Sequence, residues 1–200
     1  ICGRAHTNAE GGKGSSEIGG AVYGGNDDAD NSGTLQYIRL EYTGFAFDEE
    51  HEANGISFYS VGNGTIVDHC QAYKGSDDGF EFFGGSVNVS NLVAVSCSDD
   101  AFDWTEGWNG KGTNLVAYQE AESTLGYDCD CLMECDNNGS NNAATPVAHP
   151  VLKNLILVGN GGSKQGIRLR AGTEVEIDNA KVCGKGQPLT VETALTENAL

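Results

Sequence analysis

The sequence predicts an all-β protein in which parallel strands stack as the coils of a solenoid. Three observations carry this prediction: 29 glycines beside 3 prolines, the lack of a long run of helix-forming residues, and a pair of strand-like segments that recurs about every 22–25 residues. Such a repeat is too short for a propeller blade and too rich in strand for a helical repeat. We expect residues 1–200 to form one such domain, an ordered part of a longer exported precursor.

The first segment of each repeat alternates apolar and outward-facing residues. It reads GISFY from Gly55, GFEFF from Gly79, AFDWT from Ala101, LMECD from Leu132 and GIRLR from Gly166. Because side chains of a strand point to opposite faces in turn, the second and fourth residues of each segment face a core. These inward pairs are Ile56/Phe58, Phe80/Phe82, Phe102/Trp104, Met133/Cys135 and Ile167/Leu169.

The second segment of each repeat begins with His or Asn: His69, Asn91, Asn114, Asn154 and Asn179. Four of the five follow the first core residue by about 11–13 residues, and the fifth repeat contains the loop NNGSNNAATPVAHP, residues 137–150. A recurring Asn fits an internal ladder, in which each amide bonds the coils above and below and satisfies buried turn backbone. We interpret His69 as a member of this ladder rather than as a catalyst or ligand.

Three stretches carry a resemblance to a known family: YGGNDDADNSGTLQYIRLEYTG, NGISFYSVGNGTIVDHCQAYKGSDDGFEFFGG and GIRLRAG. The chain resembles a right-handed parallel β-helix of the pectate-lyase-like superfold, and more narrowly the secreted or lipid-anchored surface proteins of Bacteroidetes-type bacteria. The resemblance implies about five or more coils with inserted loops, and a location outside the cell or on the outer membrane. It implies no single activity, because one fold hosts many functions.

The charge of the chain limits its partners. The formal net charge is −18, from 29 acidic and 11 basic residues, which argues against nucleic acid or an anionic membrane as a partner. Cations are the natural counterpart. A membrane-spanning segment is not expected, since no run of about 18 apolar residues occurs.

The outward residues of the first segments form a predicted column of charge. In order they are Ser57, Glu81, Asp103, Glu134 and Arg168. Equivalent residues on neighbouring strands lie about 4.8 Å apart, and like charges at that distance are destabilising. Three explanations stay open: the carboxylates splay into water or pair with bases, they bind a cation such as Ca²⁺, or they catalyse a reaction through a raised pKa.

Two further acidic elements are candidate metal ligands. The doublets Asp77/Asp78 and Asp99/Asp100 precede the strands; they either cap the corners or add Asp78 and Asp100 as ligands beside the column. The loop NDDADNSG places Asp28, Asp30 and Ser32 as in the first half of a calcium loop. The closing acid of an EF-hand would fall on Arg39, which excludes that motif and leaves a β-corner calcium site or a turn rich in Asx bonds.

Cysteine usage gives no clear metal motif. Seven cysteines cannot all pair within the chain, so at least one thiol is free or bonded elsewhere. Cys129, Cys131 and Cys135 lack the paired spacing of a structural zinc site. Core packing or one local disulfide is the preferred interpretation of these residues.

Catalysis is the first alternative for function. A polysaccharide lyase would need a cation and a base, and Arg168 lies one coil beyond Glu134, although arginine is a poor base. SDDGFEFF faintly resembles the Asp-Asp turn of polygalacturonases, whose partner motifs are missing here. The candidate catalytic residues are Glu81, Asp103, Glu134 and Arg168.

Binding is the preferred function. Trp108, Phe83, Tyr59 and Phe45 lie in turns or at exposed positions, where they could stack on sugar rings or cover the coil edges. Together with Arg170, the first three are the candidate ligand-binding residues. The sequence therefore predicts a non-catalytic, calcium-stabilised surface module that binds a glycan or another surface protein, without an organic cofactor; a structural subunit of a surface assembly is the second alternative.

Overall fold

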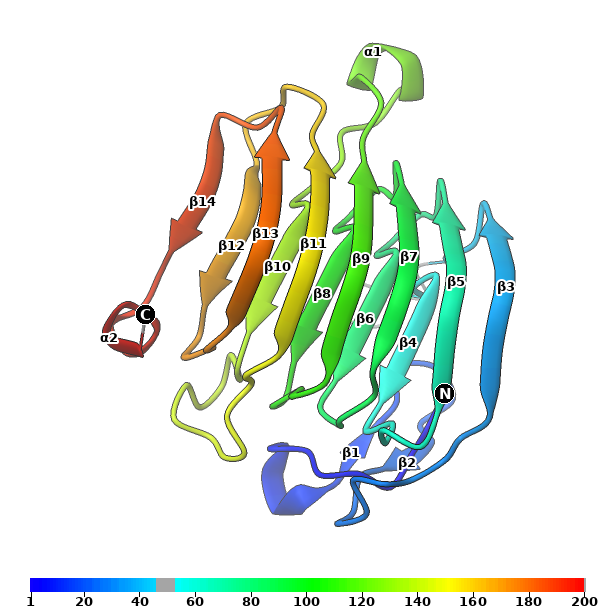
Figure 1. Cartoon of the computed structure of the whole chain (residues 1–200), viewed down its shortest axis with the longest axis vertical. Coiled ribbons are helices and arrows are strands. Elements are labelled where there is room, and N and C mark those ends of the chain that lie inside the picture. Colours follow the sequence, from blue (N-terminus) through cyan, green and yellow to red (C-terminus); the bar gives the residue numbers. More distant parts are fainter. Residues whose placement is uncertain (46–52, 200) are drawn as a thin grey trace.

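In the computed structural model, which describes residues 1–45 and 53–199, two six-stranded parallel sheets are stacked coil upon coil (Figure 1). The short-strand sheet consists of β4 (Ile56–Tyr59), β6 (Phe80–Phe83), β8 (Phe102–Thr105), β10 (Met133–Asp136), β12 (Gln165–Arg170) and β14 (Gln187–Val191). The long-strand sheet consists of β3 (Thr34–Glu41), β5 (Ile66–Tyr73), β7 (Val89–Val95), β9 (Lys111–Tyr118), β11 (Val151–Val158) and β13 (Glu176–Cys183). Successive strands alternate between the sheets, which confirms the predicted right-handed parallel β-helix.

The remaining elements lie at the ends and corners of the stack. A small antiparallel hairpin, β1 (Gly14–Ser15) and β2 (Val22–Tyr23), follows the 3-10 turn η1 (Glu10–Gly12). The short helices are α1 (Glu122–Leu125), between β9 and β10, and α2 (Ala194–Ala199), after β14. Helix is therefore scarce, as the glycine-rich composition indicates.

The five first segments form β4, β6, β8, β10 and β12, and their predicted inward pairs fill the core. Phe80, Phe102 and Trp104 are at most 1% exposed, whereas Ile56, in the first coil of this sheet, is partly exposed. Phe80 stacks on Phe102 with ring centroids 5.6 Å apart, so equivalent residues of successive coils pack on one another. This stacking fixes the register in which the outward residues are also aligned.

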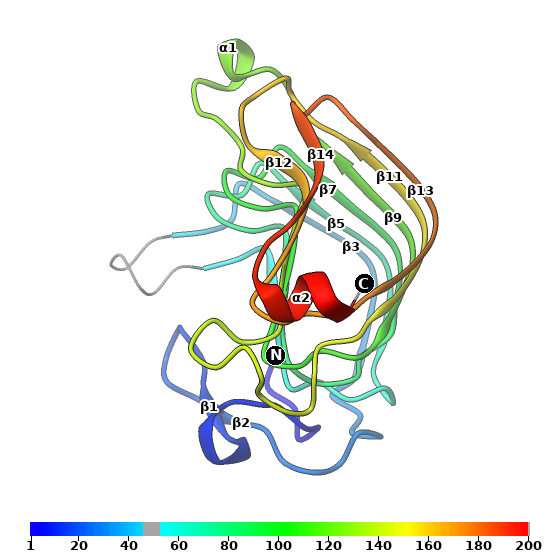
Figure 2. The same cartoon turned by 90° about the vertical axis from the view of Figure 1, so that its left-hand side faces the viewer.

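The strands of the long-strand sheet bend sharply halfway along their length (Figure 2). In this sheet, β7, β9, β11 and β13 each carry the predicted Asn in the left-handed region, at φ of 55 to 62° for Asn91, Asn114, Asn154 and Asn179. Asn tolerates this conformation better than other non-glycine residues because its short polar side chain can hydrogen-bond locally. One such residue per coil accounts for the bend.

The predicted amide ladder exists, but it lies at the surface rather than inside. Asn114 Nδ2 donates to Asn91 Oδ1 at 2.9 Å, Asn154 Nδ2 to Asn114 Oδ1 at 3.0 Å, and Asn179 Nδ2 to Asn154 Oδ1 at 2.8 Å. The left-handed residue breaks the alternation of the strand, and the amides bond one another instead of turn backbone. The prediction of an internal ladder was therefore wrong about its location.

His69 occupies the ladder position with φ of 52°, but it forms no amide rung. Its ring stacks on Tyr37 with centroids 4.9 Å apart, and its Nδ1 lies 2.8 Å from Asp68 Oδ2. Asn91 Nδ2 donates to Asp68 Oδ1 at 2.8 Å instead. The ladder consequently ends at Asp68.

Candidate functional site

The predicted column of outward residues is present on the short-strand sheet. The strand register pairs Ser57 with Glu81, Glu81 with Asp103, Asp103 with Glu134, and Glu134 with Arg168. In each strand, the residues directly before and after this position point into the core. Because the side chains of a strand alternate between its two faces, the residue between them points outward. Four successive strands therefore present three carboxylates and one guanidinium in a line.

The carboxylates at the centre of this column do not splay into water. Glu81 is 8% exposed, and the neighbouring corner residues Asp78 and Asp100 are 6% and 4% exposed. Burial, and next the Asp103 carboxylate, raises the pKa of Glu81 well above its usual range; burial and Glu134 do the same for the pKa of Asp103. The charged forms of these groups lack the water that would stabilise them.

Two groups of carboxylates share Asp103. Asp78, Glu81 and Asp103 each offer an oxygen within 4.8 Å of the others, and so do Asp100, Asp103 and Glu134. Ca²⁺ binds carboxylate and carbonyl oxygens at about 2.3–2.6 Å, so oxygens on opposite sides of one ion are about 5 Å apart. The spacing of the first group fits a single hard cation.

Among the residues that the structure describes, two buried oxygens beside the first group have no hydrogen-bond partner. One is Asp103 Oδ1, and the other is Oδ1 of Asn54, a residue that is 9% exposed. Asn54 Nδ2 donates to Glu81 Oε2 at 2.5 Å and to Ser57 Oγ at 3.0 Å, which places its free oxygen next to the carboxylates. An unpartnered buried acceptor costs about 1–3 kcal/mol, and a cation would satisfy both oxygens.

The other end of the column is neutralised by protein groups. Arg168 Nη1 donates to Glu134 Oε1 at 3.0 Å, and Arg170 Nη2 donates to Glu134 Oε2. Arg170 Nε also donates to Asp136 Oδ1 at 2.7 Å, and Arg168 Nε to Glu192 Oε1 at 3.1 Å. Both oxygens of Glu134 are thus occupied, so the Asp78, Glu81 and Asp103 group is the better candidate for a cation.

These contacts also bear on Arg168 as a base. The hydrogen bond from its guanidinium to Glu192, followed by the charges of Glu134 and Glu192, raises the pKa of Arg168 further above its ordinary value. A guanidinium held by two carboxylates stays protonated. The geometry gives no support to Arg168 as the proton acceptor of a lyase.

The corner aspartates link successive coils. Asp78 Oδ1 accepts from the backbone N–H of Asp100 at 2.8 Å, and Asp100 Oδ1 accepts from that of Cys131 at 2.6 Å. These contacts correspond to the predicted corner-capping role. They also leave the second oxygen of Asp78 and Asp100 outside the capping bonds, so capping and cation binding are compatible.

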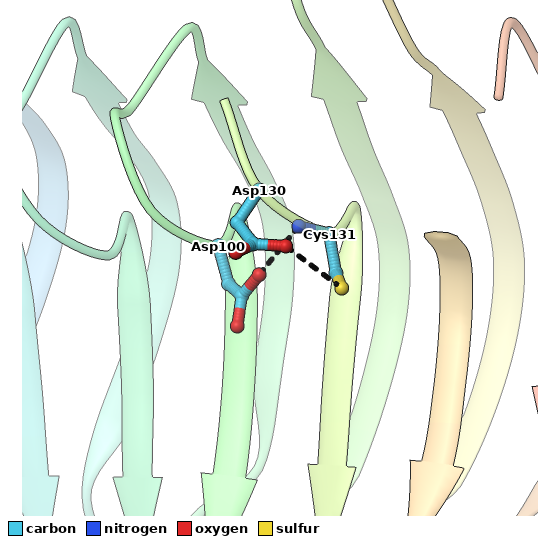
Figure 3. A group of neighbouring side chains, drawn as sticks. All are labelled: Asp100, Asp130 and Cys131. Atoms are coloured by element: carbon cyan, nitrogen blue, oxygen red, sulfur yellow. Dashed lines mark hydrogen bonds between the residues drawn. The ribbon is translucent and has the colours of Figure 1, made fainter. Parts of the chain in front are cut away.

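Figure 3 shows the last of these corners, where Asp100, Asp130 and Cys131 meet. The Cys131 thiol donates to Asp130 Oδ1 at 3.3 Å, and Lys164 Nζ lies 2.6 Å from Asp130 Oδ2. Burial, and next the Asp100 charge, raises the pKa of the Cys131 thiol. The sulfur therefore stays protonated, and metals bind thiolate rather than thiol, so this corner is a weaker metal candidate than the all-oxygen group.

The candidate calcium loop is held by protein donors instead. Asp28 Oδ1 lies 3.0 Å from the His6 backbone nitrogen, which donates to it, and 2.9 Å from His6 Nδ1. Asp30 Oδ1 accepts from Arg4 Nε at 2.9 Å, and Asp30 Oδ2 from Ser32 Oγ at 2.8 Å. Asp30 and Ser32 thus bond each other, while Arg4 and His6, which lie 26 and 22 residues away in sequence, donate to Asp30 and Asp28.

Trp108 and Tyr59 are buried, which corrects the prediction that they offer exposed rings to a ligand. Trp108 is 1% exposed, and its ring stacks on Phe82 with centroids 4.1 Å apart because the corner after β8 folds back over the core. Tyr59 is 5% exposed and is covered by Tyr23 of the β1–β2 hairpin, at 5.1 Å between centroids.

Phe83 and Arg170 keep part of their surface. Phe83 stacks on Tyr59 with centroids 4.5 Å apart and is half-buried. Arg170 is bound to Glu134 and Asp136, as described above. Of the four candidate ligand-binding residues, the structure thus leaves only the edge of Phe83 and the guanidinium of Arg170 within reach of a large ligand.

Sequence reasoning missed Asn54, Asp136 and Glu192. A signal for Asn54 existed: it lies two residues before the first core residue of its strand, as Asp78 and Asp100 do in theirs. Glu192 follows β14, a strand that the repeat pattern did not predict. Its contact with Arg168 bridges 24 residues and leaves no local pattern.

Comparison with known proteins agrees with this architecture. Neither curated proteins nor solved structures give a significant match to the chain. Within residues 1–45 and 53–199, no helix has the length and apolar character needed to cross a bilayer. A family model described as a pectate-lyase like beta helix domain matches residues 1–200, and the chain therefore belongs to the family of pectate-lyase-like β-helix domains.

Proposed function

We propose that this domain is a non-catalytic, calcium-stabilised module that binds glycans at a bacterial cell surface. The observation that carries the calcium site is Asp103, whose buried Oδ1 has no partner within residues 1–45 and 53–199, while Asp78 and Glu81 place carboxylate oxygens within 4.8 Å of its carboxylate. All three ligands are hard oxygen donors, the chemistry that Ca²⁺ prefers. The free Oδ1 of Asn54 is the natural fourth ligand.

The ion would act as a counter-charge within the fold. Asp78, Glu81 and Asp103 have raised pKa values because burial disfavours their charged forms. A divalent cation favours the charged forms again and removes the repulsion between neighbouring strands. The coils of the short-strand sheet would thereby be tied together at β6 and β8.

Catalysis by these carboxylates is less well supported than binding. A glycosidase acid must touch the glycosidic oxygen, and Glu81, Asp78 and Asp100 are at most 8% exposed. A lyase would need a base, and Arg168 is held by Glu134 and Glu192. Polysaccharide lyase or glycoside hydrolase activity remains the alternative that the test below separates from binding.

Glycan is the favoured ligand class for two reasons. The family description names pectate lyase, an enzyme of polysaccharides, and the fold offers long surfaces to polymers. The partly exposed Phe83 and the 63% exposed Phe45 supply apolar rings for sugar faces. The partner would be a glycan or another protein of the surface outside the cell, with a structural role in a surface assembly as the second alternative.

The calcium site is tested by thermal unfolding of the purified domain in EDTA, Mg²⁺ and Ca²⁺. We expect Ca²⁺ to raise the unfolding temperature of the wild type and to leave that of Glu81→Gln unchanged. Asp28→Asn is the matched control, since it alters the other predicted calcium loop and should keep the full Ca²⁺ response. A response lost in Asp28→Asn and retained in Glu81→Gln would move the site to residues 26–33.

Glycan binding is tested separately, by native electrophoresis of the domain through gels that contain soluble polysaccharides, followed by assay of the polysaccharide for new reducing ends and double bonds. Retardation with an intact polysaccharide is the expected result. A shortened polysaccharide, with cleavage abolished in Asp103→Asn, would replace the binding proposal by the enzymatic alternative.

A further inference from the structure

A groove of about 540 Å³ lies on the outer face of the long-strand sheet, away from the carboxylate column. Its lining includes the four ladder asparagines together with Val116, Ile156 and Lys181. The asparagines belong to β7, β9, β11 and β13, so the groove crosses these strands and runs along the axis of the solenoid. Its volume falls in the range of about 300–1,000 Å³ that is typical of ligand sites.

The ladder bonds take up at most half of the hydrogen-bonding capacity of each asparagine amide. An Asn amide has two N–H donors and an oxygen that accepts twice, and each ladder bond uses one donor and one acceptor. Asn114, for example, donates to Asn91 and accepts from Asn154 while its side chain is exposed. The wall of the groove thus offers a donor and an acceptor once per coil.

The spacing of this array favours a polymer. Equivalent positions on adjacent parallel strands repeat about every 4.8 Å. That distance is close to the length of one sugar residue in an extended polysaccharide, so successive sugars can lie opposite successive amides. A small ligand would hydrogen-bond to one asparagine of the ladder and would not contact the others.

An apolar strip lies beside the ladder. Val116, Ile156 and Lys181 are register neighbours on β9, β11 and β13, and Ile156 is 50% exposed. Aliphatic side chains suit the apolar face of a sugar ring, whereas the amides suit its hydroxyls. Lys181 adds an ammonium donor at one end.

We propose that this groove binds a neutral, linear polysaccharide that lies along the solenoid axis, a proposal that rests on the glycan-binding function above. The net charge of −18 disfavours polyanions, and the described residues that line the groove, with their amides, aliphatic side chains and one lysine, offer no carboxylate to a polycation, which favours a neutral chain. The four rungs predict that affinity rises with oligosaccharide length up to about four sugars and then levels off, because longer chains find no further amide.

The test uses gels that contain hydroxyethylcellulose, xylan, galactomannan or polygalacturonate. Ile156→Glu places a charge on the apolar strip, and Ile66→Glu is the matched control, since Ile66 is 49% exposed on the outer face of β5 outside the groove. Lys181→Gln is the second groove variant. We expect Ile156→Glu to weaken binding of a neutral polysaccharide at least tenfold, Lys181→Gln to weaken it less, and Ile66→Glu to leave it unchanged.

The outcomes separate this inference from the proposed function. Equal retardation of the wild type, Ile156→Glu and Lys181→Gln would overturn the groove while leaving glycan binding in place. Retardation by polygalacturonate alone would overturn the choice of a neutral chain. A wild type that no polysaccharide retards would overturn the proposed function and, with it, this site.

Discussion

Two columns of polar side chains run along the same coils, the asparagine ladder and the carboxylate column. Only in the asparagine ladder do the side chains of the column hydrogen-bond one another. On the long-strand sheet, each asparagine after Asn91 donates to the one before it, at 2.8–3.0 Å, and Asn91 donates to Asp68. On the short-strand sheet, Glu81 and Asp103 are equivalent neighbours, but carboxylates only accept. A repeated polar position in a solenoid can therefore satisfy its own hydrogen bonds only when its side chain carries both a donor and an acceptor.

The carboxylate column shows how the missing donor can be supplied. Around Glu134, the chain itself provides Arg168 and Arg170. Around Asp78, Glu81 and Asp103, the described residues supply an amide N–H from Asn54 and a backbone N–H from Asp100, and Asp103 Oδ1 stays without a partner. This half of the column must gain protons or a cation.

The largest expected effect comes from removing a rung of the asparagine ladder. Asn114→Ala loses two amide bonds, at about 0.5–1.5 kcal/mol each, and forces Ala into the left-handed region, at about 1–2 kcal/mol. We expect the free energy of unfolding, measured by denaturant titration, to fall by about 2–5 kcal/mol. Asn114→Gly should lose less, because glycine accepts this backbone; a larger loss in Gly than in Ala would contradict the account of the bend.

The raised pKa values of the carboxylate column should make the free energy of unfolding depend on pH. Asp78, Glu81, Asp100 and Asp103 have raised pKa values, so above about pH 4 the folded state binds more protons than the unfolded state. The free energy of unfolding should therefore decrease as the pH rises from about 4 through the raised pKa values, by about 1.4 kcal/mol per pH unit for each extra proton bound. Denaturant titrations in EDTA measure this slope.

Calcium should flatten that slope, since the ion holds the carboxylates ionised in the folded state. Asp28 and Asp30 act in the opposite sense: although burial raises their pKa values, hydrogen bonds from His6 and Arg4 bring them below the ordinary range. Their contribution is present above the unfolded-state pKa and is lost as the pH falls below about 4. A free energy of unfolding that increases from pH 4 to pH 7 in EDTA would contradict the raised pKa values of the carboxylate column.

Asp103→Asn should make the carboxylate column resemble the amide ladder. The new side chain supplies a donor to its carboxylate neighbours and removes one buried charge. We expect the free energy of unfolding in EDTA to increase by about 1 kcal/mol and the stabilisation by Ca²⁺ to disappear. Asp68→Asn, on the other sheet, is the control that should retain the Ca²⁺ effect.

The smallest expected effect comes from extending the ladder at its first coil. His69→Asn places an amide at a position that already has φ of 52°, next to Asn91, but loses the stacking on Tyr37. We expect the free energy of unfolding to increase by about 0.5 kcal/mol. A clear decrease would show that the ring of His69 contributes more than a ladder rung.

The strands and their register could be predicted from the sequence because period-two alternation is a local signal. Phe80/Phe82 and Phe102/Trp104 are inward by pattern alone, and their alignment also aligns Glu81 with Asp103. The face of the ladder could not be predicted, since a left-handed residue within a strand breaks the alternation from which faces are counted.

Burial by residues that are distant in sequence could not be predicted either. Trp108 lies in a glycine-rich turn, where no periodicity indicates direction, and the structure turns it into the core. Tyr59 has an outward position in β4 but is covered by Tyr23, a contact across 36 residues with no local pattern. His6 and Arg4, which donate to Asp28 and Asp30, are likewise distant from them in sequence and leave no local pattern.

The loop of residues 137–150 has a consequence for engineering. It enters between β10 and β11, yet β11 keeps the same register with β9 on both sides of Asn154, from Val151 opposite Lys111 to Val158 opposite Tyr118. Its tip, at Gly139 and Ser140, is exposed. Doubling the length of a loop costs about 0.6 kcal/mol, so a foreign peptide grafted between these two residues should be displayed on the solenoid without displacing its coils.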